Sequence, residues 1–247
     1  MSLKRKEELF MIKGIIWDVD DTLYDQLLPF QSAVKQTFPE IYPHLPMDAF
    51  YKQFRHNSDA VFFKQVSGEW SLEYMRQYRI QQTLLDFNYP KISLETAQVF
   101  QEHYQYELDH IELMPAIRSL LDLLAKTSLQ LGVITNGPSD HQHKKIKQLS
   151  LSKWIPTSQI IVSGDVQTEK PGASIFKQME IRTGLKEGEL LYIGDSFAND
   201  VVGANQANWS VLWFNHRHHS PLDLELSYTE ILSVDELVNY LHQHHLS

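Results

Sequence analysis

A short apolar run near the start of the chain ends abruptly in acidic residues. Ile15–Trp17 has the character of a buried β-strand, and the segment Asp18–Thr22 that follows carries three carboxylates and a threonine. Side chains two residues apart on an extended chain point to the same side, so the charges of Asp18 and Asp20 repel each other unless a cation lies between them. The segment therefore predicts a strand that ends at an acidic, cation-binding site.

Composition limits the kinds of protein this chain can be. Its 247 residues allow one large α/β domain, or a core with a smaller inserted unit. Hydrophobic residues make up 43% and charged residues 21%, as in ordinary globular proteins. The net charge of -9 argues against a nucleic-acid polymer as partner. A small anionic substrate stays compatible with this charge, because a metal ion and one lysine reverse the field locally.

Cysteine usage and the lack of long apolar runs bear on location. The sequence has no cysteine, so disulfides, thiolate zinc sites and cysteine nucleophiles are excluded, and a cytoplasmic location is predicted. No apolar run approaches the roughly 18 residues that span a bilayer, so we expect no membrane partner. Residues 1–10 are highly charged and lack the apolar region of a signal peptide; we interpret them as an N-terminal extension.

Strands and helices alternate along most of the chain. Apolar runs predict strands over 12–17, 130–135, 160–163, 190–194, 210–214 and 228–232, and helical spacing predicts helices over 116–126, 139–149, 171–183, 198–206 and from 234 onward. This order predicts an α/β fold, a doubly wound, Rossmann-like parallel sheet covered on both faces. Ligands of such sheets bind beyond the carboxyl ends of the strands.

Residues 26–112 interrupt that pattern. They show helical spacing, little strand character and several prolines, which divide them into four or five helices. We therefore expect an inserted α-helical cap domain at 26–112 and an α/β core at 11–25 and 113–247. At helical spacing the cap aromatics Phe54, Phe62, Phe63 and Trp70 are expected to form the cap's own core. Arg76 and Arg79 are expected on solvated helix surfaces.

The ends of the other predicted strands carry a complementary set of groups. The second strand ends at Thr135-Asn136, where turn amides suit an anion, and Lys170 follows the third. The fourth runs into a segment with carboxylates at Asp195 and Asp200. Phosphoryl transfer needs an in-line nucleophile, positive charge for the phosphate oxygens and a proton for the leaving group, and these residues supply all three.

This order and spacing resemble the haloacid dehalogenase superfamily of phosphohydrolases, through DxDxT at Asp18–Thr22 and GDxxxxD ending in Asp195–Asp200. The resemblance covers the whole core and implies a type-one helical cap. It implies a magnesium-dependent phosphatase with an aspartyl-phosphate intermediate. Asp18 would be the nucleophile, and Asp20 the general acid and then the general base.

The same resemblance assigns the remaining site residues. Mg²⁺ would be held by Asp18, the main-chain carbonyl of Asp20, and Asp195, with Asp200 orienting the metal's water ligands. Three other residues would bind phosphate: Thr135, Asn136 and Lys170. Among the neighbours of the first motif, Asp21 is expected to be a solvated or turn-capping acid, and Trp17 to pack in the core.

Substrate and alternative reactions are less constrained. Dehalogenases and phosphonate hydrolases of this superfamily lack the second acid, so Asp20 argues against both, although Lys52 and Lys64 of the cap would offer the amine that a phosphonate hydrolase uses. A phosphomutase would keep every core motif, whereas a non-catalytic binding module would lose some. The ending Tyr228–Ser233 is similar to the 5′-nucleotidase-like subgroup, which favours nucleoside 5′-monophosphates over sugar phosphates or phosphoglycolate as the small phosphorylated substrate. The clustered histidines are interpreted as solvated polar runs, and nothing indicates an oligomeric state.

Overall fold

The computed structural model describes residues 11–245 and divides the chain into two compact units. One unit holds the residues up to Tyr24 together with those from Glu112 onward, and the other is Asp25–Ile111. Each unit is built around its own buried side chains. The predicted extension at 1–10 lies outside the described residues.

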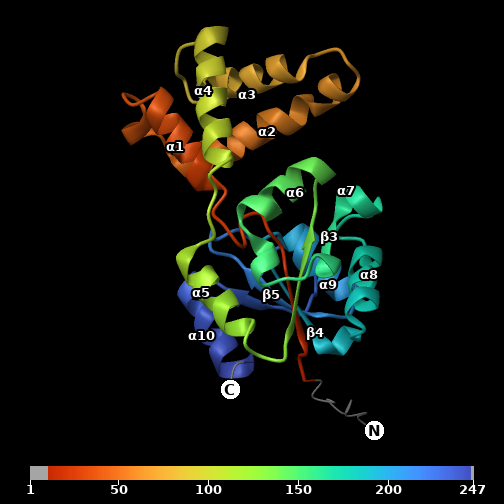
Figure 1. Cartoon of the computed structure of the whole chain (residues 1–247). Coiled ribbons are helices and arrows are strands. Elements are labelled where there is room, and N and C mark those ends of the chain that lie inside the picture. Colours follow the sequence, from red (N-terminus) through yellow and green to blue (C-terminus); the bar gives the residue numbers. More distant parts are fainter. Residues whose placement is uncertain (1–10, 246–247) are drawn as a thin grey trace. The chain divides into compact units, whose positions relative to one another are not determined.

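The first unit is built on a parallel β-sheet (Figure 1). Its strands follow the order β3-β2-β1-β4-β5-β6, and every neighbouring pair is parallel. The strands are β1 (Gly14–Trp17), β2 (Gln130–Thr135), β3 (Ile160–Val162), β4 (Leu190–Gly194), β5 (Ser210–Phe214) and β6 (Thr229–Ile231). The prediction of a doubly wound α/β fold is confirmed.

The position of β1 in the middle of the sheet explains why its sequence is entirely apolar. All four of its residues are buried, as expected for a strand covered on both faces. Trp17 pairs with Val133 of β2 and with Ile193 of β4, so the neighbouring strands β2 and β4 extend one or two residues beyond the end of β1. The segment after β1 therefore emerges between the ends of its two neighbours.

Helices cover both faces of this sheet: α5 packs against α10, and α8 contacts α9 and β2 (Figure 1). They are α5 (Pro115–Leu124), α6 (Ser139–Gln148), α7 (Ser163–Val166), α8 (Ala173–Thr183), α9 (Val202–Gln206) and α10 (Val234–His245). The predicted helix over 198–206 is a π-helical turn, Phe197–Val201, followed by α9. Ser163 begins α7 instead of ending β3, and its hydroxyl accepts a hydrogen bond from the Gly137 amide (2.9 Å).

The second unit is helical. Its α-helices, all within the described residues, are α1 (Leu27–Thr37), α2 (Met47–Val66), α3 (Leu72–Asp86) and α4 (Leu94–Leu108). Aromatic rings fill its core: Phe30 lies 4.7 Å from Phe54 and 5.8 Å from Phe100, between ring centroids. None of the helices in residues 11–245 combines the length and apolarity that a membrane crossing requires.

Two expectations for this unit were wrong in part. Phe54 is in the core, but Phe62 and Phe63 are 56% and 62% exposed, because they lie on the solvent side of α2. Arg79 is not a solvated surface residue: its guanidinium lies 4.4 Å from the Phe54 ring centroid and donates to Gln101 (2.9 Å). Burial lowers the pKa of Arg79 to about 10, and the cation–π contact partly offsets the cost of desolvation.

Candidate active site

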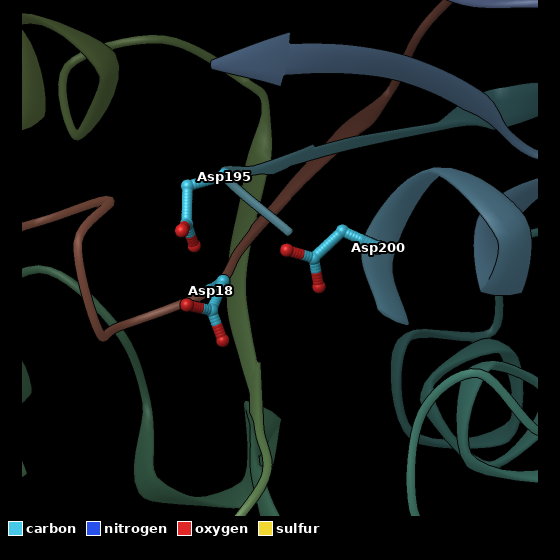
Figure 2. Close-up of side chains that lie close together, drawn as sticks. All are labelled: Asp18, Asp195 and Asp200. Carbon is cyan, nitrogen blue, oxygen red and sulfur yellow. The ribbon is translucent and has the colours of Figure 1, made fainter. Parts of the chain in front are cut away.

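Three carboxylates meet where β1 and β4 end (Figure 2). Asp18 directly follows β1 and Asp195 directly follows β4, whereas Asp200 comes from the π-helical turn. One oxygen of each lies within 4.8 Å of the other two. The register of the two strands causes this meeting, and the Asp18 amide hydrogen-bonds to the Ile193 carbonyl (2.9 Å). The structure thus brings together three predicted site residues from segments far apart in the sequence.

Lys170 is the cation of this cluster. Its ammonium group lies 2.6 Å from Asp18 Oδ1 and 2.7 Å from Asp200 Oδ1, and it donates to the Tyr192 hydroxyl (2.9 Å). Only 4% of Lys170 is exposed. The Tyr192 hydroxyl donates its own hydrogen bond to the Ile134 carbonyl (2.9 Å), so every donor of the ammonium group has a fixed acceptor. Lys170 is therefore held rigidly against the predicted nucleophile.

One ammonium group does not balance three carboxylates, of which Asp18 and Asp200 are buried and Asp195 is partly exposed. Burial raises the pKa of Asp18 to about 7, with the charges of Asp200 and Asp20 adding to the effect against the opposing pull of Lys170. Burial, followed by Asp200 and Asp18, also holds the pKa of Asp195 well above its usual value. Among the described residues, the Asp195 side chain accepts one weak hydrogen bond, from the Thr22 hydroxyl at 3.5 Å. The cluster therefore has excess negative charge.

This excess charge fits a hard divalent cation. Mg²⁺ prefers oxygen ligands and binds through one or two carboxylates while keeping several waters. Asp18 and Asp195 offer such oxygens. The Asp200 oxygens already accept hydrogen bonds, one from Lys170 and the other from the Ser196 amide (2.9 Å). This arrangement suits a residue that orients a water ligand of the metal. The donor set thus matches a magnesium site.

The Asp20 side chain has its own set of partners. Oδ1 accepts from the Tyr24 hydroxyl (2.6 Å), Oδ2 accepts from Gln142 Nε2 (3.0 Å), and Lys145 Nζ reaches both oxygens at 2.6 and 2.7 Å. Burial alone would raise the pKa of Asp20, but the charge of Lys145 and the hydrogen bonds from Lys145, Tyr24 and Gln142 together outweigh it and lower this pKa to about 2. Asp20 is therefore a carboxylate here, the form that a general base needs. Acting as an acid requires it to take up a proton first.

The end of β2 contributes two groups to the site, the hydroxyl of Thr135 and the side-chain amide of Asn136. Thr135 is fully buried at the end of β2, and its Oγ1 has no hydrogen-bond partner among the described residues. The Asn136 side chain donates to the Lys170 carbonyl (2.9 Å) and accepts from the Lys170 amide (3.0 Å). Asn136 thus fixes the backbone of Lys170. The sequence did not suggest this role.

Close packing at Gly194 helps to bring Asp200 inward. A Cβ atom at this position would overlap the Asp200 carboxylate, so only glycine lets the end of β4 approach it so closely. Asp200 is completely buried as a result. The glycine of the GDxxxxD pattern is therefore required by the shape of the site.

Of the two expectations for Asp21, a solvated acid or a turn-capping acid, the solvated one was wrong. Asp21 is only 7% exposed. The Arg217 guanidinium donates two hydrogen bonds to its carboxylate (Nε to Oδ2 2.5 Å, Nη2 to Oδ1 2.8 Å). His216 Nε2 also hydrogen-bonds the Asp21 carbonyl (2.9 Å). His216 and Arg217, which follow β5, therefore fix the position of the loop that carries Asp21. Trp17 is fully buried, as predicted.

Sequence reasoning missed most of the residues that surround the acids. Gln142 and Lys145, three apart on α6, share a helix face, and this spacing was the one available signal. Tyr192 and Arg217 gave none, because their polar atoms acquire meaning only through contacts across the sheet.

Known proteins resemble this chain over most of its length. A glyceraldehyde 3-phosphate phosphatase of Pyrococcus furiosus is 26% identical over 215 residues, which are 87% of this chain and 85% of that protein. A phosphoglycolate phosphatase of Yersinia pestis is 24% identical over 79% and 78% of the two chains. A pyrimidine 5′-nucleotidase of Streptococcus pneumoniae is 29% identical over 47% of this chain and 49% of its own.

Solved structures share the fold. A magnesium-bound HAD-hydrolase of Bacillus subtilis matches with a TM-score of 0.65 at 22% identity, covering 94% of this chain and 99% of that one. The L-2-haloacid dehalogenase of Xanthobacter autotrophicus matches with a TM-score of 0.60 at 16% identity and the same coverage. The family model of haloacid dehalogenase-like hydrolases matches residues 15–214, which include every predicted motif. The chain therefore belongs to the haloacid dehalogenase-like hydrolase family.

Proposed function

We propose that this protein is a magnesium-dependent phosphatase that hydrolyses small phosphomonoesters through an aspartyl-phosphate on Asp18. The observation that carries the proposal is the buried contact of Lys170 with Asp18 and Asp200 beside Asp195. Such a cluster pairs a nucleophile with the positive charge that a phosphoryl group requires.

In the first step, an Asp18 oxygen attacks phosphorus while the bond from phosphorus to the ester oxygen breaks. Asp20, once protonated, transfers its proton to the departing alcohol oxygen. Lys170 and the unpartnered Thr135 hydroxyl bind the non-bridging oxygens of the phosphate, with the Asn136 backbone amide beside them. Asp18 is the nucleophile in this scheme, because Lys170 holds it in a single orientation.

In the second step, Asp20 removes a proton from water as the water attacks the aspartyl-phosphate. The phosphorus–Asp18 bond breaks, and inorganic phosphate leaves. Asp20 enters this step as a carboxylate, because the hydrogen bonds to both of its oxygens and its low pKa keep it deprotonated. The proton that it gains is the one it donates in the next turnover.

Magnesium would bind to Asp18, Asp195 and the main-chain carbonyl of Asp20, with Asp200 orienting its water ligands. Bound Mg²⁺ supplies charge neutralisation for the substrate phosphate and for the acidic cluster. The unbalanced carboxylates at the site support this assignment.

The names of the relatives support a small phosphomonoester as substrate. They are phosphatases of glyceraldehyde 3-phosphate and phosphoglycolate and a pyrimidine 5′-nucleotidase. We retain nucleoside 5′-monophosphates as the first candidates, with sugar phosphates and phosphoglycolate as the alternatives. A cytoplasmic location remains a prediction from composition.

Hydrolysis of 4-nitrophenyl phosphate with and without Mg²⁺ tests the reaction. We expect metal-dependent turnover that D18N abolishes and that D122N preserves; Asp122 is an exposed acid paired with Lys153. Acid-quenched protein should carry one phosphoryl group on the peptide containing Asp18. Metal-independent turnover, or full activity of D18N, would refute the assignment. A panel of the candidate metabolites then identifies the substrate.

A further inference from the structure

We propose that Lys145, together with Gln142, positions Asp20 for proton transfer. This inference rests on the proposed phosphatase function and assigns a role to a helix face outside the recognised motifs. Within the described part of the chain, Lys145 forms its ion pair with Asp20 and with none of the three clustered carboxylates, so it acts through Asp20.

Hydrogen bonds to both oxygens hold the Asp20 carboxylate in place. The Lys145 ammonium group straddles the two oxygens at 2.6 and 2.7 Å, and Gln142 Nε2 adds a contact to Oδ2 at 3.0 Å. The Tyr24 hydroxyl binds Oδ1 at 2.6 Å. Rotation of the carboxylate about its terminal bond would break at least two of these contacts, so they select one orientation.

Gln142 connects the hydrogen bonds around Asp20 to the rest of the site. It is only 3% exposed, and its Nε2 also donates to the Asn136 carbonyl (2.8 Å). The side chain of Asn136 in turn holds the Lys170 backbone. The orientation of Asp20 is thus fixed to the same loop that fixes Lys170, which contacts the nucleophile.

The position of Lys145 differs from that of an ordinary surface ion pair. Its side chain is 20% exposed and that of Asp20 is 22% exposed, so water competes weakly for the contact. Lys147 lies on the same helix but is exposed. Replacing Lys147 removes the same charge from α6 and leaves Asp20 untouched, which makes K147M a matched control.

The test separates the two steps of the reaction with 4-nitrophenyl phosphate. Nitrophenolate leaves without a proton donor, so the first turnover should keep its rate in K145M. The second step needs Asp20 as a base, so the steady-state rate should fall ~10- to 100-fold, the range expected when a catalytic group is misplaced by about 1 Å. The KM should fall in the same proportion as kcat, because the unchanged first step leaves kcat/KM unchanged. K145R should recover part of the rate, and K147M should match wild type.

Introducing K145M into the D20N variant distinguishes a role of Lys145 in positioning Asp20 from a role in binding substrate. If Lys145 acts through Asp20, K145M/D20N should be no slower than D20N. If Lys145 binds phosphate directly, K145M should raise KM in both backgrounds and slow the first turnover, and this result would overturn the inference. Wild-type rates in K145M would overturn it as well while leaving the phosphatase assignment intact. A wild-type protein inactive on every phosphate ester would overturn both proposals, and circular dichroism of each variant checks that it is folded.

Discussion

Replacing Lys170 with methionine tests whether the site depends on one buried cation. Methionine keeps the length and apolar stem of lysine and removes only the charge. Lys170, Asp18 and Asp200 are 4%, 5% and 0% exposed, so the carboxylates cannot regain full hydration after the substitution. Removing one partner of a buried ion pair costs about 3–5 kcal/mol, because the other charge is left uncompensated. We expect K170M to lose that much unfolding free energy in metal-free buffer.

A surface lysine provides the reference for this loss. Lys177 also contacts two carboxylates, those of Glu180 and Glu187 at 2.9 and 2.8 Å, but its side chain is 41% exposed. Solvent-exposed pairs contribute about 0–1 kcal/mol. The two methionine variants should therefore differ by at least about 2 kcal/mol, taking the upper value of one range and the lower value of the other.

Urea unfolding followed by tryptophan fluorescence measures this difference at the site. Of the five tryptophans, only Trp70 lies outside the unit that holds the site, so the signal reports chiefly on that unit. Added Mg²⁺ should restore more stability to K170M than to wild type, because a bound cation stabilises the folded state in proportion to its affinity. A K170M protein as stable as K177M without metal would refute the view that Lys170 compensates a desolvated cluster.

Four further substitutions test other parts of the site. G194A should lower the unfolding free energy by about 1–3 kcal/mol and reduce phosphatase activity, because its methyl group displaces Asp200; urea unfolding and initial rates measure both effects. N136A removes two hydrogen bonds to the backbone of the buried lysine, so kcat should fall while the fold persists, as rates and circular dichroism would show. D21A and R217A should each cost about 1–3 kcal/mol, and their double variant should cost less than the sum, because they form one bidentate pair; additive losses would contradict that pairing.

Three of the predicted site residues share one origin. Asp18, Thr135 and Asp195 emerge at or directly after the ends of parallel strands, and these ends meet at one edge of the sheet whatever the connections between them. An apolar run that stops at a polar residue marks such an end within a few residues. The fold class and the acidic cluster could therefore be predicted from local patterns alone.

The partners that tune these acids have a different origin. Lys145 and Gln142 lie 125 and 122 residues from Asp20, and Arg217 lies 196 residues from Asp21. Their contacts depend on the faces that helices and loops present after folding, and a local pattern does not report those faces. Asp21 illustrates the consequence. Its backbone has φ 58°, a conformation that aspartate tolerates in a turn, so an aspartate at this position was equally compatible with a solvent-exposed turn. The chemistry of this site is encoded at strand ends, whereas the low pKa of Asp20 depends on helix residues more than a hundred positions away. Substitutions at the latter should therefore change individual steps of the reaction while leaving its type unchanged.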